Sequence, residues 1–281
     1  MRYLLYNPLS GKENQARSDA ECYEVVANVP VTLIPITEIE NFRAFYDDLK
    51  LCDDIVIFGG DGTLNRIANE LSGCFIRNDI YYFPCGTGND FAKDLGVDDT
   101  RDPIMINDYL KSLPTVTVNG KKRRFINGVG FGIDGYCCEI GDILKSKHKA
   151  PNYASIAIKG ALFHYKPVNA TATVDGITYH FENVWITPTM LGRYYGGGMM
   201  PTPNQNRDAV DKKVSLMVFH NSGRLKTLAI FPSLFKGKHV KRKNNVAILQ
   251  GKRITVTFDR PSSLQIDGET VLNVTSYTVE L

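Results

Sequence analysis

The cysteines of this sequence lack the spacing of a metal site or of a disulfide framework. There are six among 281 residues; four are scattered among apolar neighbours, and the adjacent Cys137 and Cys138 do not form a CxxC motif. Zinc sites and disulfide-rich domains show cysteines paired at regular spacing, so reduced thiols with a structural role are the expectation. Reduced thiols favour a cytoplasmic location.

Long apolar runs and a strong excess of one charge are absent as well. No apolar run reaches the length that spans a bilayer, and the chain enters a polar loop at Asn7, too early for a signal peptide. Any membrane contact is therefore expected to be peripheral, on the inner face of the membrane. The net charge of +3 is too small to indicate a nucleic-acid binder, so no nucleic-acid partner is predicted.

Residues 55–65 contain an apolar run, a glycine turn and the start of a helical pattern. Four apolar residues precede the turn, as in a buried parallel strand, and an apolar stripe with helical spacing follows it. Gly59, Gly60 and Gly62 permit a close approach of the main chain to an anion beside the positive end of a helix. The pattern predicts a phosphate site. Asp61 would then act on a metal ion, water or a substrate hydroxyl, or else cap the helix.

A second strand, glycine turn and helix follow at residues 80–95, with the turn at residues 84–90. Turns at the carboxyl ends of neighbouring parallel strands line one crevice, so the two glycine turns are expected to lie side by side. The alternative is that Asn89 and Asp90 only cap the helix that follows and do not contact a ligand.

The remaining elements of the first half continue this alternation of strands and helices. Strands are predicted at residues 3–6 and 31–36, and helices at residues 14–27 and around residues 39–49. The loop at residues 7–12 contains Gly11-Lys12, but position 6 is Tyr where a P-loop needs glycine. The P-loop interpretation therefore fails, although this loop can still contact phosphate.

After Pro114 the pattern changes to short alternating strands, which places a domain boundary within residues 112–120. We predict a Rossmann-like parallel α/β domain at residues 1–115 and a β-sandwich at residues 116–281, whose last strand is also compatible with packing back on the first domain. Helices are predicted at residues 152–163 and 222–235. The predicted strands are 115–118, 124–127, 169–174, 177–181, 184–187, 214–219, 246–249, 254–258, 263–266 and 277–280.

Residues 130–135 match the GxGxxG pattern literally. A dinucleotide fingerprint also expects an acidic residue about twenty positions further on, and this chain has no Asp or Glu between Asp142 and Asp175. Dinucleotide binding is therefore not predicted.

Six motifs in order make the chain resemble the diacylglycerol kinase catalytic family, which includes bacterial soluble lipid kinases and sphingosine kinases. The resemblance covers nearly the whole chain. The motifs are Asn7-Pro8-x-Ser10-Gly11, Gly59 to Thr63, Gly86-Thr87-x-Asn89-Asp90-Phe91-Ala92, Gly128 to Asp134, Tyr195 to Met199, and Gln265-x-Asp267-Gly268-Glu269.

The resemblance implies an ATP-dependent kinase for a lipid alcohol. It implies Asp267 as the general base, with Asp61 and Glu269 placing Mg²⁺ or water, although Asp267 is alternatively only a hairpin turn residue. The residues it implies for nucleotide binding are Asn7, Pro8, Ser10, Gly11, Thr37, Gly59, Gly60, Asp61, Gly62, Thr63, Leu64, Asn65, Gly86, Thr87, Asn89 and Asp90.

One stretch departs from the family pattern. The family has a structural metal loop in its second domain, where this chain reads Asp211-Lys212-Lys213. Asp211 is retained as the metal ligand, but the two lysines would compete with a bound cation.

Two other functions compete with a lipid kinase. NAD kinases and 6-phosphofructokinases share the Gly-Gly-Asp-Gly turn, so a soluble acceptor is one alternative, and a catalytically inactive nucleotide- or lipid-binding protein is the other. The lipid itself and the oligomeric state are not encoded in a readable pattern.

Basic residues gather in two parts of the second half. Residues 143–174 contain five lysines, no acid, and the aromatic residues Tyr153, Phe163 and Tyr165, and residues 236–243 add a second basic cluster. An anionic membrane surface is the predicted partner of this face, and an ordinary solvated face is the alternative.

Overall fold

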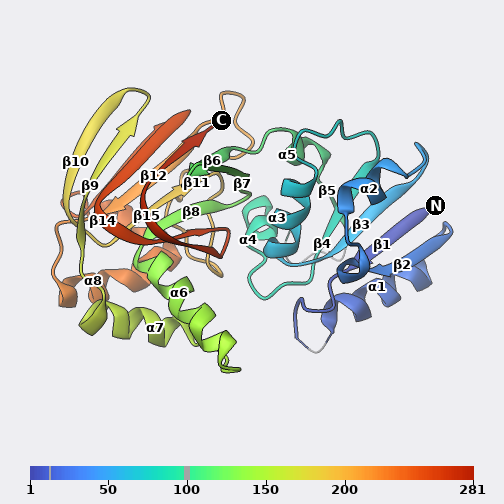
Figure 1. Cartoon of the computed structure of the whole chain (residues 1–281), viewed down its shortest axis with the longest axis horizontal. Helices are drawn as coiled ribbons and strands as arrows, with labels where there is room; N and C mark the ends of the chain where they lie inside the picture. Colours follow the sequence, from blue (N-terminus) through green and yellow to red (C-terminus); the bar gives the residue numbers. More distant parts are fainter. Residues whose placement is uncertain (13, 98–101) are drawn as a thin grey trace. The chain divides into compact units, whose positions relative to one another are not determined.

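The computed structural model describes residues 1–12, 14–97 and 102–281, which form two compact units (Figure 1). The first unit is Met1–Leu113 and the second is Pro114–Leu281. The sequence analysis placed the boundary at 115/116. Each unit has its own sheet, and the two are described separately.

The first unit is built on a five-stranded sheet in the order β2-β1-β3-β4-β5, counted over its described residues. Four strands are parallel, and β5 runs antiparallel to β4 at the edge. The central strand β3 is buried from Ile55 to Gly59, as expected for an apolar run covered on both faces. The strands are β1 (Arg2–Tyr6), β2 (Val31–Pro35), β3 (Asp54–Gly59), β4 (Asp79–Pro84) and β5 (Ile104–Met105).

The helices of the first unit follow the strands as the pattern predicted. The predicted stripe of α3 is buried, including Leu64, Ile67 and Leu71. The helix expected around residues 39–49 is shorter, because Asn41 accepts from the Ala44 N–H and starts a new helix there. The helices are α1 (Gln15–Val26), the 3₁₀ turn Ile36–Glu38, α2 (Phe42–Asp47), α3 (Asp61–Glu70), α4 (Asp90–Leu95) and α5 (Asn107–Lys111).

The second unit is built on an antiparallel sheet of the sandwich type that was predicted. Its main path runs β13-β12-β11-β8-β14-β15-β6-β7, and β9 joins β10 to β14. The strands are β6 (Thr115–Val118), β7 (Lys121–Arg124), β8 (Gly128–Gly132), β9 (Val168–Val174), β10 (Ile177–Val184), β11 (Ile186–Met190), β12 (Val214–Phe219), β13 (Val246–Gly251), β14 (Arg253–Ile266) and β15 (Glu269–Glu280).

Three strand predictions in this unit need correction. The strand at 124–127 is wrong, because β7 ends at Arg124 and the N–H groups of residues 126–128 bond to a side chain instead of a neighbouring strand. The strands at 254–258 and 263–266 are one strand, β14, whose pairing with β15 shifts register between Thr257 and Leu264. The last strand, predicted at 277–280, is longer: β15 begins at Glu269 and pairs with β14 and β6 in the sheet of the second unit.

Helices of the second unit lie along one side of its sheet (Figure 1). The helix α6 was not predicted, because its glycines weaken the helical pattern. One of them, Gly135, is needed for packing, since a Cβ there would lie 1.9 Å from the Ser263 carbonyl oxygen on β14. Pro232 follows the end of α8, as expected. The helices are α6 (Ile133–Ser146), α7 (Tyr153–Lys159), the π-turn Gly160–His164, α8 (Arg224–Ile230), and the 3₁₀ turns Phe231–Lys236 and Lys238–Lys241.

The core of the second unit gathers where these helices cover β11 and β12. Trp185, the single tryptophan of the sequence, is buried there and its indole N–H donates to the Ser222 carbonyl at 2.7 Å. Among the described residues no helix is long and apolar enough to cross a membrane.

Candidate active site

Three loops meet at the carboxyl ends of β1, β3 and β4 in the first unit. The Asn7 main-chain N–H donates to the Phe58 carbonyl at 2.9 Å, and its side-chain amide donates to the Thr63 hydroxyl at 2.7 Å. The Ser10 hydroxyl lies 3.3 Å from the same hydroxyl of Thr63. The loop after β1 is thereby tied to the turn after β3, as expected for parallel strands that end at one edge of a sheet.

Glycine is required where these loops cross. A Cβ on Gly86 would lie 2.6 Å from the Gly60 Cα, and a Cβ on Gly11, whose φ is +79°, would lie 2.6 Å from the Cys85 carbonyl oxygen. A Cβ on Gly62 would meet no atom within 4 Å, so this glycine borders open space instead of protein. The turn after β3 is therefore packed on one side and open on the other, which suits the approach of a ligand to the main chain.

The open side of this turn coincides with the start of α3. Leu64 is the first residue whose N–H bonds to a carbonyl of the turn, that of Gly60 at 3.1 Å. The N–H groups ahead of it have no earlier helical carbonyl to bond, and the helix dipole adds positive potential. Main-chain donors and a positive helix end together favour an anion such as phosphate.

Asp61 lies at this helix start, but its carboxylate bonds to the next helix. Its two oxygens accept the N–H groups of Asp90 and Phe91, both at 2.9 Å, so Asp61 caps α4. The carboxylate therefore has a structural role that was not predicted, and its roles on a metal ion, water or a substrate hydroxyl stay predictions. The bonds join the two glycine turns, which the sequence predicted to lie side by side.

Asn89 has a different role from the predicted cap of α4. Its side-chain oxygen accepts the Gly86 N–H at 2.8 Å and closes the glycine turn, while its own φ is +50°. The side chains of Leu64, Asn65 and Asp90 are buried, so these predicted nucleotide residues face the protein interior. Thr37 is exposed in the 3₁₀ turn after β2, at the same edge of the sheet as the loop after β1.

Asp267 occupies the turn between β14 and β15 in the second unit. One carboxylate oxygen accepts the N–H groups of Asn127 and Gly128 at 2.9 Å, and the other accepts the Ile126 N–H at 2.5 Å. Its φ of +45° is that of a turn residue, so the hairpin interpretation is correct for its main chain. The side chain also holds the segment that leads into β8. Glu269 begins β15 and forms an ion pair with Arg123 of β7.

Asp211, the predicted metal ligand, lies beside lysines. Its carboxylate oxygens are 2.7 Å from the Lys252 ammonium and 3.4 Å from that of Lys213. Hydrogen bonding to Lys252 lowers the pKa of Asp211. Over residues 1–12, 14–97 and 102–281, no group of three or more His, Cys, Asp or Glu side chains is placed to hold a metal ion. Within the described part of the chain, Asp211 is therefore not part of a group of three such side chains, and its carboxylate is paired with lysines instead.

A buried polar cluster in the second unit joins residues from three of the six sequence motifs. The Tyr195 hydroxyl donates to the Asp134 carboxylate at 3.3 Å, and a Cβ on Gly130 would lie 2.6 Å from the side-chain nitrogen of Gln265. Burial raises the pKa of Asp134 to about 6. Sequence reasoning did not select these three side chains, although the motifs containing them were the available signal.

A groove of about 560 Å³ runs between α6 and α7 in the same unit. Ile140, Leu144 and Ile156 contribute its apolar wall, and Lys159 contributes a charged rim. A volume in this range accommodates a small ligand or part of a lipid chain.

Sequence models of two protein families match this chain and together cover most of it. The diacylglycerol kinase catalytic domain matches residues 2–117, and the YegS C-terminal NAD kinase beta sandwich-like domain matches residues 127–279. The chain belongs to the diacylglycerol kinase family, with a second domain of the YegS type.

Individual relatives agree with this assignment. A diacylglycerol kinase from Mycobacterium tuberculosis is 27% identical over 200 residues, which cover 68% of this chain and 63% of that protein, less than two thirds of its length. A diacylglycerol kinase from Bacillus subtilis is 25% identical over 95% of this chain and 88% of its own. A crystal structure from Bacillus anthracis has the same fold, with a TM-score of 0.71 and 21% identity over 99% of this chain and 91% of that one.

The cap formed by Asp61 leads to a prediction for Asp61→Asn. One of the two N–H groups of α4 would lose its acceptor, so we expect the amides of Asp90 and Phe91 to exchange with solvent about tenfold faster or more. Hydrogen exchange of the ligand-free protein measures this. Asp108→Asn, at the start of α5, is the matched control and should leave both amides unchanged. Equal protection in Asp61→Asn and the parent would contradict the capping role.

The buried Asp134 leads to a prediction about pH. Its folded-state pKa of about 6 exceeds the unfolded value of 3.8, so its stabilising contribution is complete below pH 4 and is lost as the pH rises through 6. In Asp134→Asn this loss, about 3 kcal/mol in all, should be absent. Denaturant unfolding followed by Trp185 fluorescence reports on this unit. Parallel stability profiles of variant and parent between pH 4 and 7 would refute the burial of an ionisable Asp134.

Proposed function

We propose that this protein is an ATP-dependent kinase that transfers the γ-phosphoryl group to the hydroxyl of a lipid such as diacylglycerol. The observation that carries the proposal is the meeting of three loops at one edge of a parallel sheet, where glycine is required for the crossing and Gly62 borders open space. Membership of the diacylglycerol kinase family supports the lipid acceptor.

The loop and glycine-turn residues of the first unit are proposed to bind the nucleotide phosphates. Main-chain N–H groups at the start of α3 would contact phosphate oxygens, while Asn7, Ser10 and Thr63 hold the loops in register. Asp61 keeps the turn after β4 beside the turn after β3. Because phosphoryl transfer depends mainly on positioning and electrostatics, a rigid cradle of this kind is the principal requirement.

Magnesium would arrive with the nucleotide in this proposal. Mg²⁺ is usually held by one or two carboxylates together with substrate phosphates, and the described residues contain no dedicated cage of acidic ligands. Asp61 is the acidic side chain of the first turn of α3 and fits such a limited role. When bound, Mg²⁺ would neutralise charge on the phosphates.

Asp267 is proposed as the base that accepts the proton of the lipid hydroxyl. Three main-chain N–H groups fix the direction of its carboxylate, which supports a positioned group. Glu269, paired with Arg123, would keep β15 and β7 in place near this turn. The apolar groove between α6 and α7 offers surface for a lipid chain.

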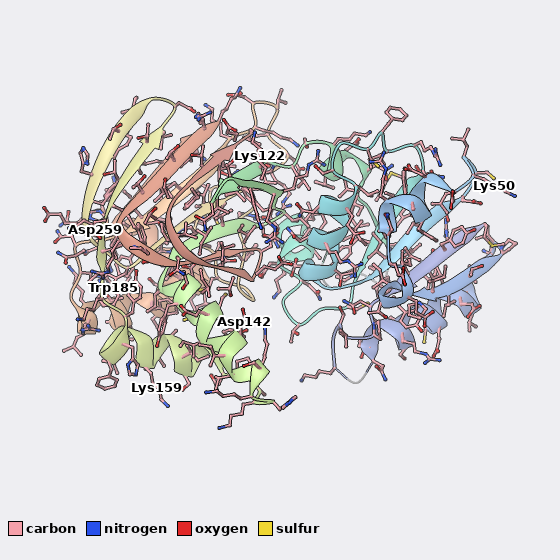
Figure 2. The ribbon with its side chains drawn as sticks, in the orientation of Figure 1. Lys50, Lys122, Asp142, Lys159, Trp185 and Asp259 are labelled. Carbon is pink, nitrogen blue, oxygen red and sulfur yellow. The ribbon has the colours of Figure 1, made fainter. Side chains whose placement is uncertain are left out.

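An anionic membrane surface is proposed as the place of reaction. Large apolar side chains are exposed on and near α6 and α7, most of all Phe163 at 71%, and Lys145, Lys147 and Lys149 are exposed at the end of α6. Figure 2 shows the Lys159 side chain extending away from α7. Tyr165, which the sequence analysis counted with the aromatic residues of this face, is buried instead. Basic residues beside exposed apolar ones are typical of peripheral membrane binding.

A screen of phosphate acceptors tests the proposed activity. The protein is incubated with ATP and Mg²⁺ and, in separate reactions, dispersed diacylglycerol, other lipid alcohols, NAD and fructose 6-phosphate, and products are identified by mass. We expect a phosphorylated lipid. Phosphorylation of only a soluble acceptor would overturn the lipid assignment, and ATP binding without any product would indicate an inactive binding protein.

Two variants separate binding from chemistry in the same assay. Gly60→Val should weaken ATP binding, because a β-branched side chain would press on Gly86, whose Cα lies 3.1 Å from the position of an added Cβ. Asp267→Asn should bind ATP normally and lose about two to four decades of turnover. Melting curves followed by Trp185 fluorescence show whether Asp267→Asn stays folded, and a folded variant with normal turnover would exclude Asp267 as the base.

Vesicle sedimentation tests the membrane proposal. We expect binding to anionic but not to neutral vesicles, and release at about 0.5 M salt, where screening shortens the reach of surface charges. Replacing Lys145, Lys147 and Lys149 with Glu should lower activity on vesicles more than on detergent-dispersed lipid. Replacing Lys50, Lys111 and Lys121 with Glu changes the net charge equally and should have a smaller effect. Equal binding to neutral and anionic vesicles would contradict the membrane proposal, and the basic residues would then be interpreted as an ordinary solvated face.

A further inference from the structure

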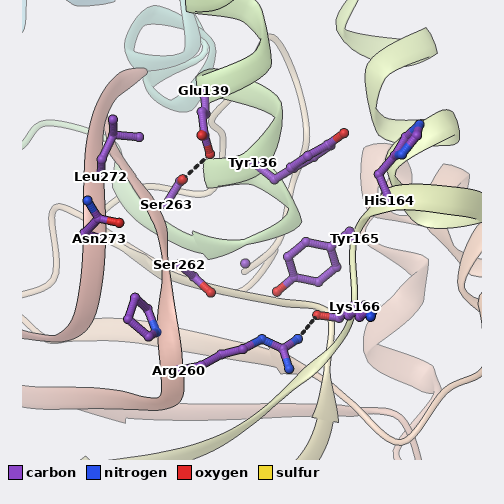
Figure 3. A pocket seen from close by; sticks show the side chains of 12 residues that line it. Tyr136, Glu139, His164, Tyr165, Lys166, Arg260, Ser262, Ser263, Leu272 and Asn273 are labelled. Atoms are coloured by element: carbon purple, nitrogen blue, oxygen red, sulfur yellow. Dashed lines mark hydrogen bonds between the residues drawn. The ribbon is translucent and has the colours of Figure 1, made fainter.

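A second concavity of the second unit is polar and lies where α6 passes the hairpin of β14 and β15 (Figure 3). Its volume is about 390 Å³, within the range of roughly 300 to 1,000 Å³ that small-ligand sites occupy. Tyr136 and Glu139 of α6 form one wall, the segment 164–166 forms another, and the irregular part of β14, residues 260–263, closes it. None of these residues belongs to the glycine loops or to the Asp267 turn.

The Tyr165 hydroxyl is an unsatisfied polar group in this cavity. The side chain is 7% exposed, and its hydroxyl has no hydrogen-bond partner among the described residues. Figure 3 shows the hydroxyl directed between the side chains of Ser262 and Arg260. Burial raises the pKa of Tyr165, so the hydroxyl stays protonated and can donate. A buried donor without an acceptor is costly, and this cost marks a place where a ligand would supply one.

Charged side chains of both signs lie around the hydroxyl, and the basic ones that line the cavity are Arg260 and Lys166. Arg260 is held in position by hydrogen bonds to the carbonyl oxygens of Lys166 and Pro167. Lys166 and His164 also line the cavity. The carboxylate in the wall, Glu139, accepts a hydrogen bond from Ser263 (Figure 3).

Two further acidic groups, Asp134 and Asp259, lie near the hydroxyl, and besides burial both raise the pKa of Tyr165. Neither lines the cavity, and Asp259 accepts the N–H of Asn169 at 3.1 Å. Among the described residues, Arg260, Lys166 and the hydroxyl-bearing Tyr136, Tyr165, Ser262 and Ser263 line the cavity, with Glu139 as its acidic residue.

We propose that this cavity binds a phosphate group, carried either by the headgroup of an anionic phospholipid or by a small phosphate ester. A phosphate has several oxygens in a tetrahedral arrangement and can accept from Arg260, Lys166 and Tyr165 together, which a single carboxylate would do less completely. The volume leaves room for the glycerol or alcohol part beside the phosphate. A bound phosphate would connect α6 to β14, the two elements that carry Asp134 and lead to Asp267.

Ligand titrations of the intact protein test this site. Inorganic phosphate, glycerol 3-phosphate and monomeric dihexanoyl phosphatidylglycerol are titrated by calorimetry at constant ionic strength, with dihexanoyl glycerol as the ligand that lacks phosphate. The variants are Tyr165→Phe and Lys166→Gln. Lys147→Gln is the control, because it removes an exposed lysine of the same region that does not line the cavity.

We expect the phosphate ligands to bind and both cavity variants to weaken binding by about tenfold or more, the factor of one charge-assisted hydrogen bond. Tyr165→Phe removes a hydroxyl that has no partner, so its melting temperature without ligand should equal or exceed that of the parent, which separates lost binding from misfolding. Binding of dihexanoyl phosphatidylglycerol alone would assign the site to a lipid headgroup. Binding of all three phosphate ligands would show that the site recognises the phosphate group itself.

Three outcomes would overturn the proposal: no binding of any phosphate ligand, equal binding by the parent and both cavity variants, or equal weakening in Lys147→Gln. Phosphate could also bind at the glycine loops of the first unit. ATP affinity is therefore measured in each variant, and it should be unchanged in Tyr165→Phe and Lys166→Gln. Failure of the proposed kinase activity would show in the screen of phosphate acceptors and not in the comparison of the cavity variants.

Discussion

In each of the two units, the candidate site residues depend on one kind of interaction, a side-chain carboxylate that binds main-chain N–H groups of a loop distant in sequence. Asp61 binds the first N–H groups of α4, and Asp267 binds those that precede β8. Loops of this kind cannot satisfy their donors by strand pairing, and buried donors without acceptors are costly. Each carboxylate therefore stabilises a loop in the conformation that a binding site needs.

Glycine and carboxylate act together at the crossing of the two turns in the first unit. Glycine removes the Cβ that would keep Gly60 and Gly86 apart, and Asp61 then holds the turns at that separation. The result is a main-chain cradle that is closed toward the sheet and open at Gly62. A cradle that is already in place when its ligand arrives loses little conformational entropy on binding, which is the advantage of such preorganisation for phosphoryl transfer.

The second unit places its unusual groups at the contact between α6 and the sheet. Asp134 in the first turn of α6 forms a buried pair with Tyr195, and Figure 3 shows the Tyr165 hydroxyl directed between Ser262 and Arg260. Both places hold a buried polar group, which is energetically unfavourable without full hydrogen bonding. At Asp134, burial raises the pKa of the carboxyl to about 6. The apolar groove and the polar cavity both border α6, so these buried polar groups lie beside the two concavities of the unit.

The sequence by itself determined the elements whose signals are local. The apolar run of β3, the stripe of α3 and the glycines between them predicted a buried strand, a helix and an anion-binding turn, and the change of pattern after Pro114 predicted a second, β-rich domain. The strand, the helix and the second domain are confirmed, because periodicity and glycine content act within a few residues, while anion binding at the turn stays a prediction.

Only the tertiary structure decided the partners of the polar side chains. Asp61 caps a helix about 30 residues further on, Asp267 holds a segment about 140 residues earlier, and Asp211 lies beside Lys252. The burial of Tyr165 and the helix α6 were likewise decided by packing, the latter because Gly135 allows contact with β14. The physical reason is that strand register and close packing set which distant groups meet, and residue type states only what each group can bind once it is there.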